Sequence, residues 1–430
     1  MREMKDSGIE WVGQIPKGWN RSKLLYCLRQ PICDGPHETP DYLDDGIPFI
    51  SVDSLNESKR VDLTQVKRFI SEHDYRMYMQ KAKIEKGDIL FSKAATIGKT
   101  AIVDDEVFMV WSPLAIIKRD KNRIDNDYLY YLLNCDALID AIRLSGSFNT
   151  QANVGMREME RAIIPIPCQT EQRRIADSLD AKCAEIDALT ADIEKHIETL
   201  EQYKRSVITE AVTKGLNPDV EMKDSGIEWV GQIPKSWSIH PVYYYFNERK
   251  NTNYALKEQN LLSLSYGRII RKDINAVGGL LPASFSTYNI VESGDIIIRP
   301  TDLQNDKRSL RTGLANERGI ITSAYIDLAP KSGIYSRFFH YLLHSYDVQK
   351  VFYNMGNGVR QGLNYSEFSK LKVFAPSITE QADIVAFLDE MCEEINTTIT
   401  QKQKQLEALS EYKKSLIYEY VTGKKEVISS

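Results

Sequence analysis

The chain has 430 residues and a formal net charge of −5, and 42% of its residues are apolar and 27% charged. This length predicts about two to four domains, and this composition argues against extensive disorder. No window approaches the ~18 consecutive apolar residues of a membrane-spanning helix, and the first residues lack the apolar core of a secretion signal. The six cysteines form no C-x-x-C pair. We therefore expect a cytoplasmic protein with reduced thiols, without a disulfide framework, a zinc site or a membrane partner.

An internal repeat organises the chain. Residues 3–19 and 221–237 are identical at 16 of 17 positions, at an offset of 218 residues. A second repeated block begins with Thr-Glu-Gln at residues 170–172 and 379–381, at an offset of 209 residues. Between these blocks the two halves diverge strongly. Such an A-B-A′-B′ order predicts two inserts that share a scaffold and perform different versions of one task.

The first insert, residues 20–165, predicts a mixed α/β domain. Short β-branched runs between turn residues predict strands at 46–52, 88–91 and 115–117. An amphipathic pattern predicts a helix over 127–142.

Residues 170–214 predict a long helix, because they contain no glycine or proline and are rich in good helix formers. Gly215 and Pro218 predict its end. Three- and four-residue spacing predicts a coiled-coil seam of Ile186, Leu189, Ile193, His196, Leu200, Tyr203 and Val207.

The second half follows the same plan. Its insert, residues 238–373, predicts a strand at 295–298 and a helix over 336–352. Residues 379–421 predict a second long helix that ends at Gly423. A helix of this length is not expected to stand alone, so the two long helices should pair.

These elements predict an α+β fold with an internal pseudo-two-fold repeat. Two mixed α/β globular domains would be separated by two long antiparallel coiled-coil helices. The predicted boundaries are 1–166 for the N-terminal domain, 167–216 for the first helix, 217–375 for the C-terminal domain and 376–430 for the second helix and tail.

The negative charge is concentrated in the long helices. Residues 170–214 carry a net charge of −3 and residues 379–421 a net charge of −5, which leaves +3 for the rest of the chain. The overall sign of the charge therefore does not exclude a nucleic-acid partner.

Motifs that would indicate catalysis are incomplete. Residues 98–100 resemble the end of a phosphate-binding P-loop, but Lys93 occupies the position of its first glycine. His340 and His344 have a spacing that could bind zinc, but no third ligand lies nearby in the sequence. The Asn/Asp-Pro-Pro-aromatic element of an adenine methyltransferase is missing. We therefore favour a binding protein over a self-contained methyltransferase or nuclease.

The repeated order resembles the specificity subunit of Type I restriction-modification systems, over essentially the whole chain. The duplicated Gly-Ile-Glu-Trp-Val-Gly-x-Ile-Pro-x-x-Trp segment opens each half, at residues 8–19 and 226–237. A Pro-x-x-x-Glu-Gln approach leads to each long helix, at 167–172 and 376–381. Patterns similar to those in the recognition domains of this family occur at 34–40 with 46–50 and at 260–267.

The resemblance implies that each insert is a target recognition domain for one half of a split, asymmetric site on double-stranded DNA. The helices would set the gap between the halves and dock two modification subunits, which bind S-adenosylmethionine and methylate adenine. Two restriction subunits, which bind ATP and Mg²⁺, would join where they exist. The chain itself would be non-catalytic and hold no cofactor or metal. The alternative is a coiled-coil scaffold whose α/β inserts bind proteins.

Candidate DNA contacts are basic and polar residues in predicted turns, because Lys and Arg bind phosphates while Arg, Asn, Gln, Ser and Thr read base edges. In the first insert they are His37, Thr39, Lys93, Thr96, Lys99, Asn149, Gln151 and Asn153. In the second they are Arg268, Arg299, Lys307, Arg308, Asn357, Arg360 and Gln361, followed by Arg271, Lys272, Arg311 and Asn364. The repeated tryptophans, Trp11, Trp19, Trp229 and Trp237, are expected to anchor packing, since both halves share them while the two recognised sequences must differ.

Overall fold

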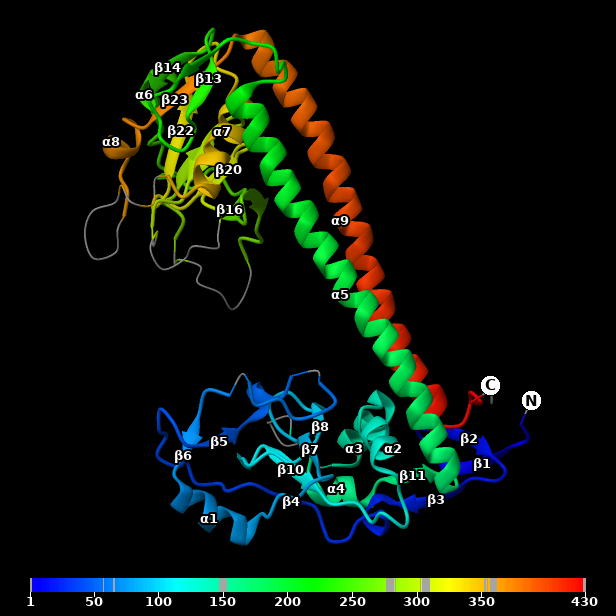
Figure 1. Ribbon diagram of the computed structural model, residues 1–430. Coiled ribbons are helices and arrows are strands. Elements are labelled where there is room, and N and C mark those ends of the chain that lie inside the picture. Colours follow the sequence, from blue (N-terminus) through cyan, green and yellow to red (C-terminus); the bar gives the residue numbers. More distant parts are fainter. Residues whose placement is uncertain are drawn as a thin grey trace. The chain divides into compact units, whose positions relative to one another are not determined.

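The computed structural model describes residues 2–56, 58–64, 66–146, 153–275, 282, 284–301, 303, 310–351, 353, 355 and 362–427. The chain divides into two units, one of Met1–Ile193 with Lys404–Ser430 and one of Glu194–Gln403. Each unit contains one α/β domain and a segment of both long helices (Figure 1). None of the helices formed by the described residues contains an apolar stretch that could span a lipid bilayer.

The first unit is built around a four-stranded antiparallel sheet of order β4-β10-β7-β8. Its strands are β4 (Cys33–Asp34), β7 (Ile89–Ser92), β8 (Thr100–Ile102) and β10 (Leu114–Ile117). The smaller strands are β1 (Met4–Ile9), β2 (Gly13–Pro16), β3 (Asn20–Lys23), β5 (Ile47–Ile50), β6 (Phe69–Ile70), β9 (Met109–Val110) and β11 (Ile163–Ile166). Its helices are η1 (Leu24–Cys27), η2 (Val52–Ser54), α1 (Glu72–Lys81), α2 (Asn126–Leu133), α3 (Asp136–Ser145) and α4 (Met156–Arg161).

Every residue of β7 and β10 is buried, because both faces of this sheet are covered. Alternate side chains of a strand point to opposite faces. Ile89 and Phe91 accordingly join the core that contains α2 and α3, whereas Leu90 joins a second core beneath β5 and β9.

The second unit repeats this arrangement, with the order β15-β22-β19-β20. The strands of its central sheet are β15 (Phe246–Glu248), β19 (Ile296–Ile298), β20 (Thr312–Leu314) and β22 (Ile326–Pro330). The smaller strands are β12 (Met222–Asp224), β13 (Gln232–Pro234), β14 (Ser238–Pro241), β16 (Leu262–Ser265), β17 (Arg268–Arg271), β18 (Asn289–Val291), β21 (Gly319–Ile321) and β23 (Lys372–Ala375). Its short helices are α6 (Val242–Tyr245), α7 (Ser336–Val348) and α8 (Tyr365–Phe368).

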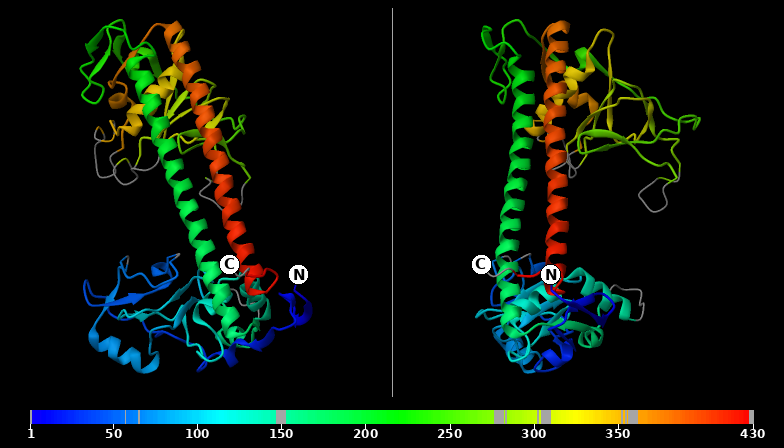
Figure 2. Two further views of the ribbon diagram at one scale, coloured as in Figure 1. Left: turned by 45° about the vertical axis from the view of Figure 1, so that its right-hand side comes forward. Right: turned by 90° about the vertical axis from the view of Figure 1, so that its right-hand side faces the viewer.

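The two long helices are α5 (Gln169–Lys214), with 46 residues, and α9 (Ile378–Val421), with 44. They run antiparallel, since within the second unit His196 contacts Lys402 while Lys204, further along α5, contacts Asn396, nearer the start of α9. Both views in Figure 2 show the two helices side by side. The predicted fold class, with two mixed α/β domains and two long antiparallel helices, is confirmed.

The Pro-x-x-x-Glu-Gln motif fixes the start of each long helix. The buried Gln172 side chain donates a hydrogen bond to the carbonyl oxygen of Pro167 (2.9 Å), and Gln381 does the same to Pro376 (3.0 Å). A buried amide needs such a partner. The glutamine of the motif is therefore a structural residue.

The repeated tryptophans Trp19 and Trp237 are buried, as predicted for packing anchors. Each lies against the glycine that ends a long helix. A Cβ atom on Gly423 would come within 3.0 Å of Trp19, and one on Gly215 within 3.4 Å of Trp237. Both glycines have φ above +70°, which ends a helix without a steric penalty.

Two details of the helix predictions are wrong. Ile186 and Ile193 are buried as expected for the seam, but Leu189 and Tyr203 are 47% and 50% exposed. The reason is that α5 packs on its own domain as well as on α9, so its buried face does not follow a two-helix seam. The helix predicted over 127–142 is two helices, because Asn134 turns its side chain back to the Tyr130 carbonyl oxygen (2.8 Å) and ends α2.

A candidate nucleic-acid interface

Two loops and the segment that begins at Asn153 meet at one end of the first central sheet. Asp34 ends β4 and Ser92 ends β7, and both pair with the first residues of β10. The backbone amide of Val154 donates to the carbonyl oxygen of Lys93 (2.8 Å), which brings the segment that begins at Asn153 to the same place. Candidates from residues 34–40, 93–99 and 153, far apart in sequence, are therefore gathered at this end.

An acidic residue lies at the centre of these loops. The carboxylate of Asp34 is 2.9 Å from the Lys93 ammonium and 3.3 Å from Nε2 of His37. Asp34 and Lys93 are largely shielded from solvent, whereas the His37 ring is exposed. A phosphate that binds Lys93 must therefore compete with Asp34.

The other first-insert candidates differ in what their side chains contact. The ammonium of Lys99 donates to the carbonyl oxygens of Leu55 (2.7 Å) and Val52 (3.3 Å), so it holds the turn η2 in place. Thr39, Thr96 and Asn153 are exposed. Asn149 and Gln151 lie outside the described residues.

The second unit brings its loops to the equivalent end of its sheet. The backbone amide of Leu363 donates to Pro300 (3.0 Å), as Val154 does to Lys93 in the first unit. Arg299 follows β19 and is partly buried, and Arg268 is exposed at the start of β17. Lys307, Arg308, Asn357, Arg360 and Gln361 lie outside the described residues.

Three of the further candidates have structural contacts. Arg311 is fully buried, so its prediction as a DNA contact is wrong: its guanidinium donates to the Thr301 carbonyl oxygen (2.8 Å). Asn364 caps α8 by accepting a hydrogen bond from the Glu367 amide (3.0 Å). Arg271 pairs with Glu317 on the surface, and Lys272 is exposed.

One exposed residue at this end of the second sheet, Tyr266, is not among the candidates predicted from the sequence. Tyr266 lies at the tip of the β16–β17 hairpin and is 80% exposed. The signal was the pair Tyr266-Gly267 between two strand-like runs, which is a two-residue hairpin turn with an unusual first residue.

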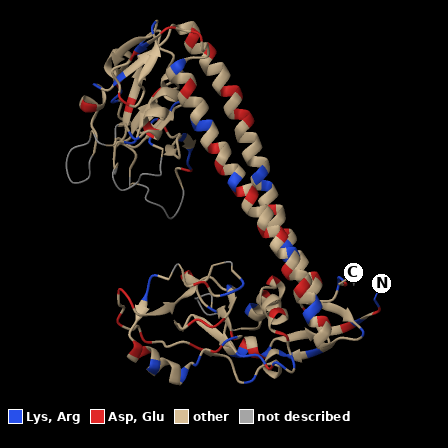
Figure 3. Ribbon diagram, viewed as in Figure 1, with Lys and Arg blue, Asp and Glu red and all other residues tan. Residues whose placement is uncertain are grey.

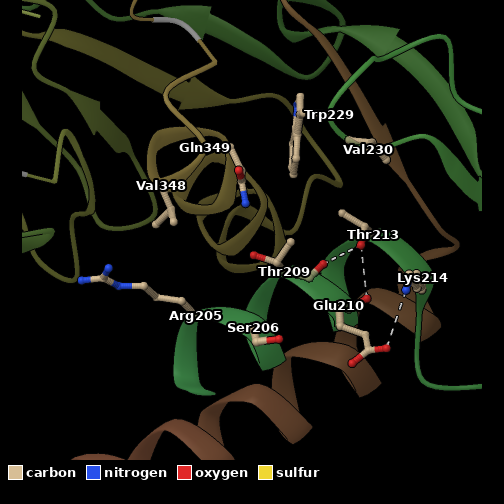
Figure 4. A pocket seen from close by; sticks show the side chains of 10 residues that line it. All are labelled: Arg205, Ser206, Thr209, Glu210, Thr213, Lys214, Trp229, Val230, Val348 and Gln349. Atoms are coloured by element: carbon tan, nitrogen blue, oxygen red, sulfur yellow. Dashed lines mark hydrogen bonds and ion pairs between the residues drawn. The ribbon is translucent and has the colours of Figure 1, made fainter. Parts of the chain in front are cut away.

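A cavity of about 450 Å³ lies in the second unit between α5, α7 and the loop that carries Trp229 (Figure 4). Its charged lining residues are Arg205, Glu210 and Lys214, of which Glu210 and Lys214 lie 3.8 Å apart along the helix. Histidine, cysteine and aspartate do not occur among the residues that line it. The lining therefore offers no serine or cysteine paired with a histidine base.

No cluster of three or more His, Cys, Asp or Glu side chains that could hold a metal ion occurs among the described residues. His340 and His344 lie on α7, where burial lowers the pKa of His340 to about 3 and that of His344 to about 4. Both rings are therefore neutral near pH 7. Figure 3 shows acidic and basic residues interspersed along α5, whereas the first half of α9 carries acidic residues without basic ones.

Comparisons with known proteins agree with this geometry. The family of the Type I restriction modification DNA specificity domain matches residues 37–199 and 312–408, one segment in each α/β domain and its helix. The chain is 25% identical to the type I restriction enzyme MjaX specificity subunit of Methanocaldococcus jannaschii, over 96% of this chain and 95% of that protein. It is 23% identical to the MjaVIII specificity subunit of the same organism, over 90% and 85% of the two chains.

The fold has also been seen before. A chain of a type I R-M system, from work on complex assembly and conformational transition, superposes with a TM-score of 0.69 at 13% identity, over 96% of this chain and 99% of that one. The chain therefore belongs to the family of the Type I restriction modification DNA specificity domain, as a non-catalytic specificity subunit with two target recognition domains.

Proposed function

We propose that the two recognition domains read the two halves of a split, asymmetric DNA target, each with the loops at the equivalent end of its central sheet. Double-stranded DNA is the partner at these ends. The long helices set the length of the unread gap and dock two modification subunits, which supply S-adenosylmethionine. Restriction subunits, which supply ATP and Mg²⁺, join the same complex where they exist.

The observation that carries this proposal is the repeated convergence of loops. The hydrogen bonds from Val154 to Lys93 and from Leu363 to Pro300 fix the same loop junction in both units. The scaffold around this junction is repeated, whereas the loops differ in length, charge and sequence. A repeated frame with unlike loops is what two unlike half-sites require.

An exchange of inserts tests the proposal. Residues 238–373 are replaced by the corresponding insert of a relative, and the chain is expressed with its modification subunits. Methylated adenines are then mapped across the host genome. We expect a new sequence in one half of the target and no change in the other half or in the gap. Changes in both halves would contradict independent recognition domains.

A matched pair of helix insertions tests the gap. Four residues, about 6 Å of helix, are added to the middle of α5 and of α9 together. We expect the same two half-sites with a longer gap. An unchanged gap would refute the spacer role. If the unaltered complex binds no DNA sequence selectively, the alternative of a protein-binding scaffold is favoured instead.

A further inference from the structure

The hairpin of β16 and β17 turns through only two residues, Tyr266 and Gly267, because Ser265 pairs directly with Arg268. Their φ angles are +45° and +78°. Two-residue hairpins with both φ values positive favour Asn-Gly, since a bulky side chain at the first position is sterically disfavoured. Tyrosine is therefore a costly choice at this turn.

Packing does not offset this cost. The Tyr266 side chain is 80% exposed. No hydrogen bond or aromatic contact joins it to any of the residues that the structure describes. A strained residue without a stabilising contact of its own points to a functional constraint.

The hairpin is held firmly against the central sheet. A Cβ atom on Gly313 of β20 would lie 2.6 Å from the side chain of Leu264 and 3.0 Å from that of Ile269, so the two layers are in close contact there. Gly267 lies against Leu310, just before β20. The tip is thus fixed beside the end of the sheet where Arg299 leaves β19, with the exposed Arg268 next to it.

The first recognition domain has no projecting hairpin at the corresponding point of its described chain. There β5 is followed by the short helix η2, which Lys99 ties down through two backbone carbonyl oxygens. The exposed aromatic tip therefore distinguishes the second domain from the first.

We propose that Tyr266 is a stacking wedge: its ring packs onto or between bases of the second half-site, while Arg268 binds an adjacent phosphate. This inference rests on the proposed function. An aromatic ring on a short rigid turn can enter a base step at little conformational cost. The turn holds the Tyr266 ring out from the protein surface, and the need for this position accounts for the strained backbone.

The test uses the complex of the specificity subunit with its modification subunits. The wild-type complex first selects its target from a library of randomised duplexes. Tyr266→Asn retains a residue suited to the turn but removes the ring, and Tyr266→Phe retains the ring. Tyr254→Ala is the matched control, because Tyr254 is an 86% exposed tyrosine outside the hairpin.

We expect Tyr266→Asn to weaken binding of the selected duplex by about 10- to 100-fold, as for the loss of one base stack. The melting temperature of the Tyr266→Asn complex should equal or exceed that of the wild-type complex. The fluorescence of 2-aminopurine, placed at successive positions of the second half-site, should change at one step with the wild type and with Tyr266→Phe, and that change should be absent with Tyr266→Asn. Tyr254→Ala should behave as the wild type.

Other outcomes overturn the inference. Unchanged affinity of Tyr266→Asn, or equal losses with Tyr266→Phe, would exclude stacking by the ring. Selection of no sequence by the wild-type complex would instead reject the proposed function, and the wedge with it.

Discussion

The two central sheets have the same strand order but neutralise a buried aspartate in different ways. In the first, Asp88 precedes β7 and pairs with Lys118, which follows β10 and is also buried. In the second, Asp295 precedes β19 and pairs with Arg249, which follows β15. Arg249 donates to both carboxylate oxygens, from Nε at 2.7 Å and from Nη2 at 3.0 Å.

The turn around each aspartate is the same. The backbone amide of Glu85 donates to the Asp88 carboxylate (2.8 Å), and that of Glu292 donates to Asp295 (2.7 Å). The carboxylate is thus part of the turn that starts the central strand. Its cation follows the adjacent strand β10 in the first sheet, but follows β15, the next strand but one, in the second. The two domains keep one fold although their sequences differ. The turn requires the carboxylate as a hydrogen-bond acceptor, whereas the buried carboxylate requires only a nearby positive charge.

The second sheet also buries another acid, Asp327, in β22. Its nearest cation is Arg249, with 3.9 Å between Arg249 Nε and Asp327 Oδ2. Burial, and then the charge of Asp295, raise the pKa of Asp327 to about 8. The second domain therefore carries a titrating group in its core at a position where the first has Ile116, whose place in the strand pairing is equivalent.

Of the substitutions that test this difference between the two sheets, Lys118→Met should change the stability of its unit most. The substitution leaves the buried Asp88 without its main cation, and loss of one partner of a buried pair costs about 3–5 kcal/mol. We expect faster hydrogen exchange of β7 and β10 and an earlier urea transition of the first unit. The matched variant Arg249→Met should affect β19 and β22 only.

Combination with Asp88→Asn provides the control, because it removes the stranded charge. The double variant should recover part of the stability lost by Lys118→Met. A single variant as stable as the wild type would show that the pair does not hold the turn.

A smaller effect is expected from Asp327→Asn, and it depends on pH. An acid whose pKa is higher in the folded state than its usual value near 4 binds its proton more tightly when folded, so its contribution to stability falls as pH rises from about 4 to about 8. Removing the carboxylate should flatten this dependence in the second unit and raise its stability at pH 8.5 by roughly 1–3 kcal/mol.

Urea denaturation at pH 5 and pH 8.5, with hydrogen exchange resolved for each sheet, measures this effect. Glu228→Gln, a change at an exposed acid in the same unit, is the control and should alter neither value. A wild-type second sheet that is equally stable at both pH values would contradict the assignment of a proton to Asp327.

Local signals in the sequence predicted much of the fold. The glycine and proline content placed the ends of α5 and α9, and short β-branched runs placed β5, β7, β10 and β19, because these features depend on neighbouring residues. The repeat predicted two related domains. The burial of Arg311, whose guanidinium donates to the Thr301 carbonyl oxygen and whose backbone amide donates to Asp347, could not be predicted, since an arginine among other basic residues is expected to be exposed.

The candidate site likewise combines features that the sequence predicts with features that it does not. That the loops at Asp34, Lys93 and Val154 meet follows from the strand order β4-β10-β7, which no local pattern encodes. Lys99 is a basic residue of the kind that contacts DNA, but its side chain supports a turn 44 residues away in the sequence. Tyr266 was missed because hairpin tips are normally read for glycine and asparagine, not for aromatic residues.

The smallest difference is expected from Lys93→Ala in the first domain. The second domain has Pro300 at the equivalent loop junction. If Lys93 leaves Asp34 to bind a phosphate, its loss should weaken DNA binding by about 3- to 10-fold and lower the slope of log affinity against log salt by about 1. Sequence preference should not change, because phosphate contacts carry no base information. Lys121→Ala is the matched control, as this exposed lysine follows β10 at the opposite end of the same sheet. An unchanged salt slope for Lys93→Ala would mean that Lys93 remains paired with Asp34 in the complex, and that the first domain, like the second with its Pro300, engages DNA without a cation at this junction.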